Sequence, residues 1–357
     1  MNREEVFWKE RANLNWHLEG DRNTIFFHKI AKIKSTSKLI TSLQNGEQVL
    51  VNPTEISNHV VDHYGNMFCT NFVLQKQLLA EEVIPQIISD ESNVVLNASL
   101  TYEIKAAVFS LNKDSSPGPD GFGAFFFQFF WNIIKEDVCK AVLEFFSSGW
   151  NLPGFNSNII ALLPKVPNAL SIDQYRPIAM ANFKFKIISK IIADRLATLM
   201  PTIVSKEQMG FIHGRNIKDF LCIASKATNL LHNKAFGGNL AMKIDITKAF
   251  DTLEWSFLLK VLKSFGFNEF FCNWIHVILK STFLSVSING KSHGYFNATR
   301  GVRQGDPLSP LLFCLVEDVL SRSISKLVED GKLQKIKGTR NISLPSHSFY
   351  ADDILQW

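Results

Sequence analysis

The chain has 357 residues, of which 46% are hydrophobic and 20% charged, so it can bury a substantial core and is not broadly disordered. Its formal net charge of +5 permits a polyanionic partner without requiring one. The five cysteines are scattered and form no Cys-x-x-Cys pair, which argues against a disulfide framework or a zinc site and favours a reducing compartment.

The first part of the chain is expected to be helical. Residues 4–38 mix aromatic with basic side chains. This mixture suits single-stranded nucleic acid, where cations meet phosphates and rings stack on bases, but an amphipathic helix with a solvated basic face has the same pattern. A hairpin with an Asn45-Gly46 turn follows. Residues 53–97 predict helices and loops without a chemical signal.

A helix, a stiff loop and a second helix are predicted next. Thr101 would cap a helix whose apolar positions run from Ile104 to Leu111. Two prolines and two glycines within residues 115–121 predict a shaped loop. The most apolar run of the chain, residues 122–134, is too short to cross a membrane. The apolar stripe of this second helix is expected to face the core and consists of Phe126, Phe129, Phe130 and Ile133.

Two basic residues mark the region that follows. A buried strand is predicted over residues 159–165 and the chain returns at Tyr175, so Lys165 and Arg176 would flank a hairpin-like excursion. They could point at one anionic ligand, for which arginine offers a planar fork and lysine a point charge. Two solvated loop cations explain the pattern equally well. Between Lys165 and Lys226 there are ten Lys/Arg against four Asp/Glu.

A helix and a glycine-bearing loop come after these cations. The helix is expected to include Ile188 and Leu196 and to end at Pro201. The loop, residues 208–215, lacks the Gly-Lys-Ser/Thr end of a P-loop. His213 in this loop fits a plain surface histidine as well as a functional one.

Residues 242–246 predict a β-strand because apolar and charged residues alternate. Met242, Ile244 and Ile246 would share the packed face, and Asp245 would lie on the other. A lone aspartate near a strand end is unremarkable by itself. Whether Asp245 has a function depends on which side chains lie opposite it.

The adjacent acids Asp352 and Asp353 lie in an apolar segment that predicts strand, tight turn and strand. Taken alone, an acidic pair at a hairpin tip is most often a solvated turn. If Asp245 faced this hairpin, the carboxylates would repel each other unless protons or cations neutralised them. Oxygen ligands with open positions suit Mg²⁺.

The remaining elements surround a distinctive loop. Ser256 would cap a helix that Gly266 ends, and a strand leads into an Asn289-Gly290 hairpin turn. In residues 300–310, two glycines allow the backbone to approach a ligand closely, and Ser-Pro marks a helix start. The loop could pack against a base pair, or it could simply cap the helix.

Three segments in this order resemble motifs A, B and C of reverse transcriptases, specifically those of non-LTR (LINE-type) retrotransposons. They are Lys243-Ile-Asp-Ile-Thr-Lys-Ala-Phe-Asp251, Arg303-Gln-Gly-Asp-Pro-Leu-Ser-Pro310 and Tyr350-Ala-Asp-Asp353. Each motif alone is weak, but together and in order they are specific.

Upstream segments extend the resemblance over nearly the whole chain. Residues 116–121, residues 164–165 with 175–178, and residues 210–215 resemble the finger motifs of that family. Residues 16–27 are similar to the segment that precedes these motifs in plant LINE elements.

The resemblance implies an α+β fold, a right-hand polymerase with fingers and a palm, in which helices pack on an antiparallel palm sheet. Residues 1–97 would form a helical N-terminal extension, residues 98–235 the fingers with part of the palm, and residues 236–357 the palm core. The chain would be truncated after motif C and lack the thumb.

The resemblance also assigns the metal ligands. Asp245, Asp352 and Asp353 would be the catalytic, metal-binding carboxylates: the first two would bind two Mg²⁺ ions, with Mn²⁺ as an alternative ion, and Asp353 would support them. Such a pair of ions can activate the attacking 3′ oxygen and stabilise the leaving pyrophosphate. Asp251 matches a motif position but is expected to be structural.

The same resemblance assigns the substrate contacts. Phe250 would lie under the incoming sugar and reject a ribose 2′-OH. Gln304 and Gly305 would line the floor for the templating pair. Lys165 and Arg176 would hold the triphosphate.

The implied function is RNA-directed DNA polymerisation with RNA template, DNA primer and dNTPs as partners, away from membranes, in the nucleus or cytoplasm. The alternative is an inactive truncated remnant that retains RNA binding. An RNA-dependent RNA polymerase is disfavoured by Phe250, and a group II intron maturase by the N-terminal segment. The oligomeric state is left open.

Overall fold

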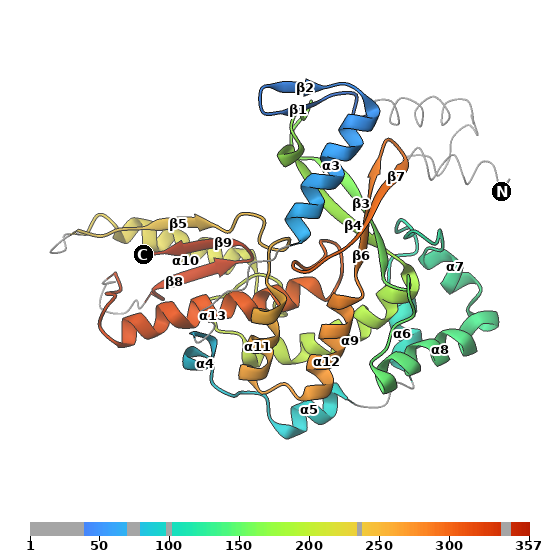
Figure 1. Cartoon of the computed structure of the whole chain (residues 1–357). Helices are drawn as coiled ribbons and strands as arrows, with labels where there is room; N and C mark the ends of the chain where they lie inside the picture. Colours follow the sequence, from blue (N-terminus) through green and yellow to red (C-terminus); the bar gives the residue numbers. More distant parts are fainter. Residues whose placement is uncertain (1–38, 70–78, 98–101, 234–237, 337–343) are drawn as a thin grey trace, which may run out of the picture.

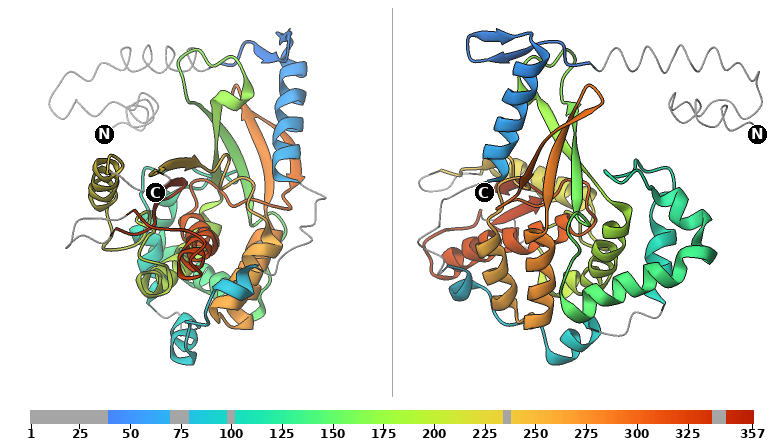
Figure 2. Two further views of the ribbon diagram at one scale, coloured as in Figure 1. Left: turned by 90° about the vertical axis from the view of Figure 1, so that its left-hand side faces the viewer. Right: turned by 45° about the vertical axis from the view of Figure 1, so that its right-hand side comes forward.

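The computed structural model describes residues 39–69, 79–97, 102–233, 238–336 and 344–357. The helix predicted over residues 4–38 and the cap predicted at Thr101 lie outside the described residues. Helices, two larger sheets and a small hairpin make up the described part (Figures 1 and 2). The mixed α and β content agrees with the predicted α+β class.

The larger sheet contains β3 (Ser157–Pro164), β4 (Tyr175–Ala181), β6 (Phe283–Ile288) and β7 (Lys291–Asn297). The strand order is β4-β3-β6-β7, with β3 and β6 parallel and the outer pairs antiparallel. The predicted turn between β6 and β7 is confirmed: Asn289 and Gly290 have φ angles of 50° and 81°, as a type I′ turn requires. The predicted excursion between Lys165 and Tyr175 joins β3 to β4.

The smaller sheet contains β5 (Met242–Asp245), β8 (His347–Tyr350) and β9 (Asp353–Gln356). The central strand is β9, which pairs antiparallel with both neighbours. Its register places Asp245 opposite Asp353 and Ile244 opposite Ile354. The predicted hairpin around the acidic pair is therefore present, and the strand that carries Asp245 lies directly beside it.

The predicted packed face of β5 is wrong. Met242 is 41% exposed and Ile244 is 40% exposed, because β5 packs chiefly against β9 among the described elements, whereas β8 at the other edge also contacts α10 and α13. Phe349 on β8 and Ile354 on β9 are fully buried, and Ile246 just beyond β5 packs partly against them. Alternation predicted the two faces of the strand correctly, but it could not show whether another element covers them.

The largest core lies among long helices below the smaller sheet and around α9 (Figure 1). The helix α13 runs beneath β8, where Ile324 contacts the sheet core. The helices that contribute most to this core are α9 (Phe183–Ile203), α11 (Trp255–Phe265), α12 (Glu269–Lys280) and α13 (Ser309–Glu329). Around them lie the longer helix α8 (Trp131–Ser148) and four short helices: α4 (Leu79–Val83), α5 (Asp90–Leu96), α6 (Glu103–Ser110) and α7 (Ala124–Phe129).

Two further helices flank the sheets. The helix α3 (Pro53–Phe68) packs its apolar face on β6 of the larger sheet (Figure 2). The helix α10 (Ile217–Leu230) lies against β8, where the rings of Phe220 and Tyr350 are 5.8 Å apart. A small hairpin of β1 (Leu43–Asn45) and β2 (Gln48–Leu50) precedes α3, with its turn one residue later than predicted.

The predicted core stripe of the Phe-rich helix is wrong except at Phe126, which packs partly against the core. Phe129 is 68% exposed and Ile133 is 77% exposed, whereas Phe127 and Trp131 face the core. The physical reason is that two helices, α7 and α8, meet here at Phe130, whose ψ of 12° breaks the helical phase. A single helical period drawn across this break selects the wrong face.

Two predicted helix boundaries shift slightly. Pro201 does not end α9, which continues to Ile203, because a proline in the last turn removes only one hydrogen bond near a frayed end. Glu254, not Ser256, precedes the first turn of α11, whereas Gly266 ends that helix in the left-handed conformation, as predicted. Within the described residues, no helix has the length and apolar character needed to cross a membrane.

Candidate active site

A cavity of about 910 Å³ opens between the two sheets, α3 and the start of α13. Six separate parts of the chain line it: α3, the β3–β4 excursion, the loop that contains Phe211, β5 with the turn after it, the loop before α13, and the β8–β9 turn. Seven of the eight residues predicted for the site lie on its wall. They are Lys165, Arg176, Asp245, Phe250, Gln304, Gly305 and Asp352.

The acidic end of the cavity is formed where β5 meets the hairpin. Asp245 and Asp352 both line the cavity, and the backbone N–H of Ile246 donates to the carbonyl of Asp352 at 3.3 Å. Asp353 differs: it is not part of the cavity wall, and its Oδ1 lies 3.1 Å from Nζ of Lys243. The structure thus brings two of the three predicted carboxylates to the cavity and engages the third in an ion pair.

The carboxylates do not form a closed metal cage. Among the described residues, no three His, Cys, Asp or Glu side chains gather closely enough to hold an ion between them. Asp245 and Asp352 do place hard oxygen donors on the wall of the same open cavity. This donor set fits Mg²⁺, which uses one or two protein carboxylates and completes its shell with water and phosphate oxygens.

Phe250 forms a firm part of the wall. Its ring stacks on Phe313 of α13, with centroids 4.8 Å apart, and its carbonyl accepts the N–H of Val302 at 2.7 Å. The ring is partly buried and cannot swing freely, because the packed helix supports it from behind. A rigid aromatic wall of this kind can exclude a substituent on a bound ligand.

Gln304 and Gly305 lie in a loop that is tied to its neighbours. The side-chain amide of Gln304 donates to both oxygens of Asp251 at 3.0 Å, and the backbone carbonyl of Gln304 accepts the N–H of Ala179 at 3.0 Å. Burial raises the pKa of the Asp251 carboxyl to about 6. Further upstream, only glycine fits at position 301, because a Cβ there would lie 2.4 Å from the carbonyl oxygen of Asp251.

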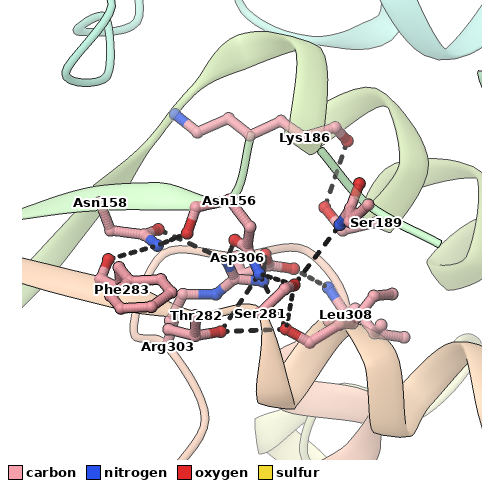
Figure 3. Close-up of polar contacts among 12 residues, drawn as sticks. Asn156, Asn158, Lys186, Ser189, Ser281, Thr282, Phe283, Arg303, Asp306 and Leu308 are labelled. Atoms are coloured by element: carbon pink, nitrogen blue, oxygen red, sulfur yellow. Dashed lines mark hydrogen bonds and ion pairs between the residues drawn. The ribbon is translucent and has the colours of Figure 1, made fainter. Parts of the chain in front are cut away.

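A buried polar cluster anchors this loop from below (Figure 3). Arg303 pairs with Asp306 at 2.9 Å, donates to Asn156, and lies over the ring of Phe185 at 4.4 Å. Asp306 also accepts the backbone N–H of Leu308, the residue that precedes α13. Because an isolated buried charge is costly, the ion pair between Arg303 and Asp306 and the hydrogen bonds around it hold the loop in one conformation.

The cationic end of the cavity centres on Asp173. Nζ of Lys248 lies 3.0 Å from its carboxylate, Nε2 of His63 lies 3.9 Å away, and Nζ of Lys165 donates to its backbone carbonyl at 2.8 Å. The hydrogen bond from Lys248 lowers the pKa of Asp173. Burial, followed by the charge of Lys248, lowers the pKa of His63. Arg176 lies at the rim and is exposed.

Sequence reasoning missed several of these residues. His63 and Tyr64 come from α3, in the stretch that showed no chemical signal, and Asp173 lies in an ordinary loop sequence. Only the fold brings them together. Lys248 could have been noticed, because it stands between Asp245 and Phe250 in one short motif.

Glu317 was also missed. It lies on α13, is almost fully buried, and accepts a hydrogen bond from Gln208. Burial raises its pKa to about 9, with smaller contributions from the charges of Asp352 and Asp318. No sequence signal marked it, because it sits within a regular amphipathic helix.

Comparison with known proteins identifies relatives of the chain. The model of the family described as "Reverse transcriptase (RNA-dependent DNA polymerase)" matches residues 163–356, more than half of the chain. A 149 kDa uncharacterized protein of transposon TX1 from Xenopus laevis is 28% identical over 354 residues, which is 97% of this chain and 26% of that protein.

Two other relatives are informative. The Pol polyprotein from the type-2 retrotransposable element R2DM of Drosophila melanogaster is 26% identical over 297 residues, 82% of this chain and 26% of that protein. The uncharacterized mitochondrial protein AtMg01250 of Arabidopsis thaliana is 42% identical over 71 residues, 20% of this chain and 58% of that protein. The chain therefore spans about a quarter of the length of the transposon proteins.

Proposed function

The chain belongs to the reverse transcriptase (RNA-dependent DNA polymerase) family, and from this premise we propose that it performs RNA-directed DNA synthesis for a non-LTR retrotransposon. It would transfer a nucleotide from a dNTP to the 3′-OH of a DNA primer paired with an RNA template. The observation that supports this most strongly is the cavity, because seven residues assigned from the motifs line it.

Asp245 and Asp352 would hold the divalent ions, Mg²⁺ or Mn²⁺, because both carboxylates reach the cavity. When bound, a pair of such ions supplies activation of the 3′ oxygen and stabilisation of the pyrophosphate. Asp353 would support them indirectly. It begins β9, and its ion pair with Lys243 of β5 would help to position the turn between β8 and β9.

The basic side chains on the cavity wall suit a triphosphate. Lys165 and Arg176 flank the β3–β4 excursion and line the cavity together with Lys248. Lys248 forms an ion pair with Asp173 in the described structure, and a phosphate group could compete with Asp173 for the ammonium group of Lys248. This arrangement would hold the substrate phosphates with charges supplied by different sheets.

The sugar and the base would meet the remaining walls. Phe250, supported by Phe313, would exclude a ribose 2′-OH and so select DNA precursors. Gln304 and Gly305 would form a flat floor for the templating pair, since the loop is tied to Asp251 and Ala179. In the family's terms, the larger sheet would belong to the fingers and the smaller sheet to the palm.

A primer-extension assay tests this function. The protein is given poly(rA)·oligo(dT), dTTP and Mg²⁺, with Asp352→Ala as the inactive variant and Asp330→Ala, an exposed acid on a distant turn, as the matched control. The wild type and Asp330→Ala should extend the primer, and Asp352→Ala should reduce extension by at least about 100-fold.

Three results would overturn the proposal. Equal extension by wild type and Asp352→Ala would reject catalysis at this site. Absence of extension by a folded wild type that still binds RNA would favour the inactive, RNA-binding alternative. Ready use of UTP on the same template would favour an RNA polymerase instead.

A further inference from the structure

The turn that carries Asp352 is held by a segment from a distant part of the chain. Glu207 and Met209 pair with the backbone of Phe349: its N–H donates to Glu207 at 2.8 Å, and its carbonyl accepts the N–H of Met209 at 2.7 Å. This short parallel bridge lies at the outer edge of β8. The catalytic hairpin is therefore braced on the side opposite β5.

The turn itself is unusual. Ala351 has a φ of 53°, in the left-handed region that non-glycine residues seldom adopt. Its N–H donates to Oε1 of Gln208 at 3.2 Å. A strained residue immediately before Asp352 needs an outside partner to keep one conformation, and Gln208 supplies it.

The side-chain amide of Gln208 forms hydrogen bonds through both its oxygen and its nitrogen, and the residue is only 1% exposed. Its Oε1 also accepts the N–H of Gly210 at 2.7 Å, and its Nε2 donates to Glu317 on α13. The side chain must therefore accept at one end and donate at the other. Glutamine meets both demands at neutral charge, whereas leucine meets neither and glutamate cannot donate while it is ionised.

The fit of the surrounding backbone is equally tight. A Cβ on Gly210 would lie 2.5 Å from the N atom of Ala351, so the segment can approach the turn only because glycine stands there. Cys314 of α13 lies beneath the same glycine, with Sγ 3.7 Å from its carbonyl oxygen. The turn, the segment and the helix thus form one packed unit.

We propose that Gln208 is a positioning residue for Asp352: it links the N–H of Ala351 to Glu317 and so fixes the turn from which Asp352 reaches the cavity. Gln208 touches neither the cavity nor a substrate position, so its effect is indirect. The inference rests on the proposed function for its kinetic consequence, but it concerns the geometry of a carboxylate and can be tested on the protein alone.

A series of variants that exchanges the two side chains tests the link. Gln208→Glu places two carboxyl groups against each other. Adding Glu317→Gln exchanges the two side chains and restores every hydrogen bond, because the new amide can donate to the new carboxylate. Gln208→Leu removes both bonds, and Glu329→Gln, an exposed position on the same helix, is the matched control.

Two measurements are made at pH 8 on each variant. The first is binding of Mn²⁺ to the free protein, followed by electron paramagnetic resonance. The second is the Mg²⁺ dependence of primer extension, with kcat and the KM for dTTP. Gln208→Glu and Gln208→Leu should weaken Mn²⁺ binding and lower kcat about tenfold with little change in KM, the size expected when a buried hydrogen bond is lost. The double exchange should recover most of both.

The outcomes separate the two ideas. If the folded wild type binds Mn²⁺ and the series follows the expected order but no variant extends primers, the positioning role stands and the proposed function fails. If Gln208→Leu folds, as judged by its thermal transition, and keeps wild-type Mn²⁺ affinity and Mg²⁺ dependence, the positioning role is wrong. A double exchange that is as impaired as Gln208→Glu also rejects it.

Discussion

The ionisation of Glu317 gives a prediction whose magnitude follows from the structure. Burial raises the pKa of this carboxyl to about 9, far above the value of 4.5 for a free glutamate. Between these values the unfolded chain releases a proton that the folded chain keeps. Stability therefore falls as the pH rises, by at most about 1.4 kcal/mol per pH unit. Below pH 4.5 the buried, protonated group carries no such penalty.

The perturbation is Glu317→Gln, which keeps the size and the acceptor for Gln208 but cannot ionise. Unfolding by urea would be measured for both proteins at pH 6, 7 and 8, with EDTA present so that no ion binds nearby. The stability of the variant relative to wild type should rise with pH, by up to roughly 3 kcal/mol from pH 6 to pH 8. Glu329→Gln should show no such trend.

The result that would refute this reasoning is a difference between Glu317→Gln and wild type that stays constant over the three pH values. It would mean that the carboxyl has the same pKa in the folded and unfolded chain, and that water or a cation reaches it. A difference that falls with rising pH would mean that a folded partner stabilises the carboxylate. Either result would contradict the buried, neutral group.

Three other predictions concern the cavity. Phe250→Val should raise the use of UTP relative to dTTP at least tenfold in primer extension, because the ring that would exclude the 2′-OH is gone; unchanged selectivity would remove Phe250 from that role. Arg176→Ala and Lys165→Ala should each raise the KM for dTTP about tenfold and leave the Mn²⁺ affinity of the free protein unchanged, as titration would show. Gly301→Ala should cost at least about 2 kcal/mol of unfolding free energy in urea, since its φ is 81° and the new Cβ would strike the backbone of Asp251; a loss below about 0.5 kcal/mol would show that the loop can yield.

Local patterns predicted the parts of the fold that local forces determine. Asn289-Gly290 is a turn because few other dipeptides tolerate two positive φ angles. Gly266 ends α11 because glycine adopts a positive φ without strain. Alternation identified β5, and the hydrophobic segments around Asp352 identified the hairpin. These signals lie within a few residues of one another, so the sequence displays them directly.

Patterns failed where tertiary contacts decide. The Phe-rich stretch was assigned one helical phase, but Phe130 interrupts it, and packing of Phe127 and Trp131 selects a different face. The apolar side of β5 was expected to be covered, yet Met242 remains exposed at the edge of its sheet. In both cases the sequence specifies an amphipathic element, and only the arrangement of neighbours decides which surface is buried.

The candidate site shows the same division on a larger scale. The residues that would touch the substrate lie in short motifs, because a strand end, a turn or a helix start presents two or three groups at once. The groups that position these residues are distant from them in the sequence. Gln208 and Glu317 are 109 residues apart, and both support the turn at Ala351, which follows them in the chain. A buried amide paired with a buried carboxyl leaves no periodic trace in a sequence, since each residue alone is ordinary on its own element. Such pairs are found by asking which partner satisfies each buried polar group, and here that question leads from Ala351 through Gln208 to α13.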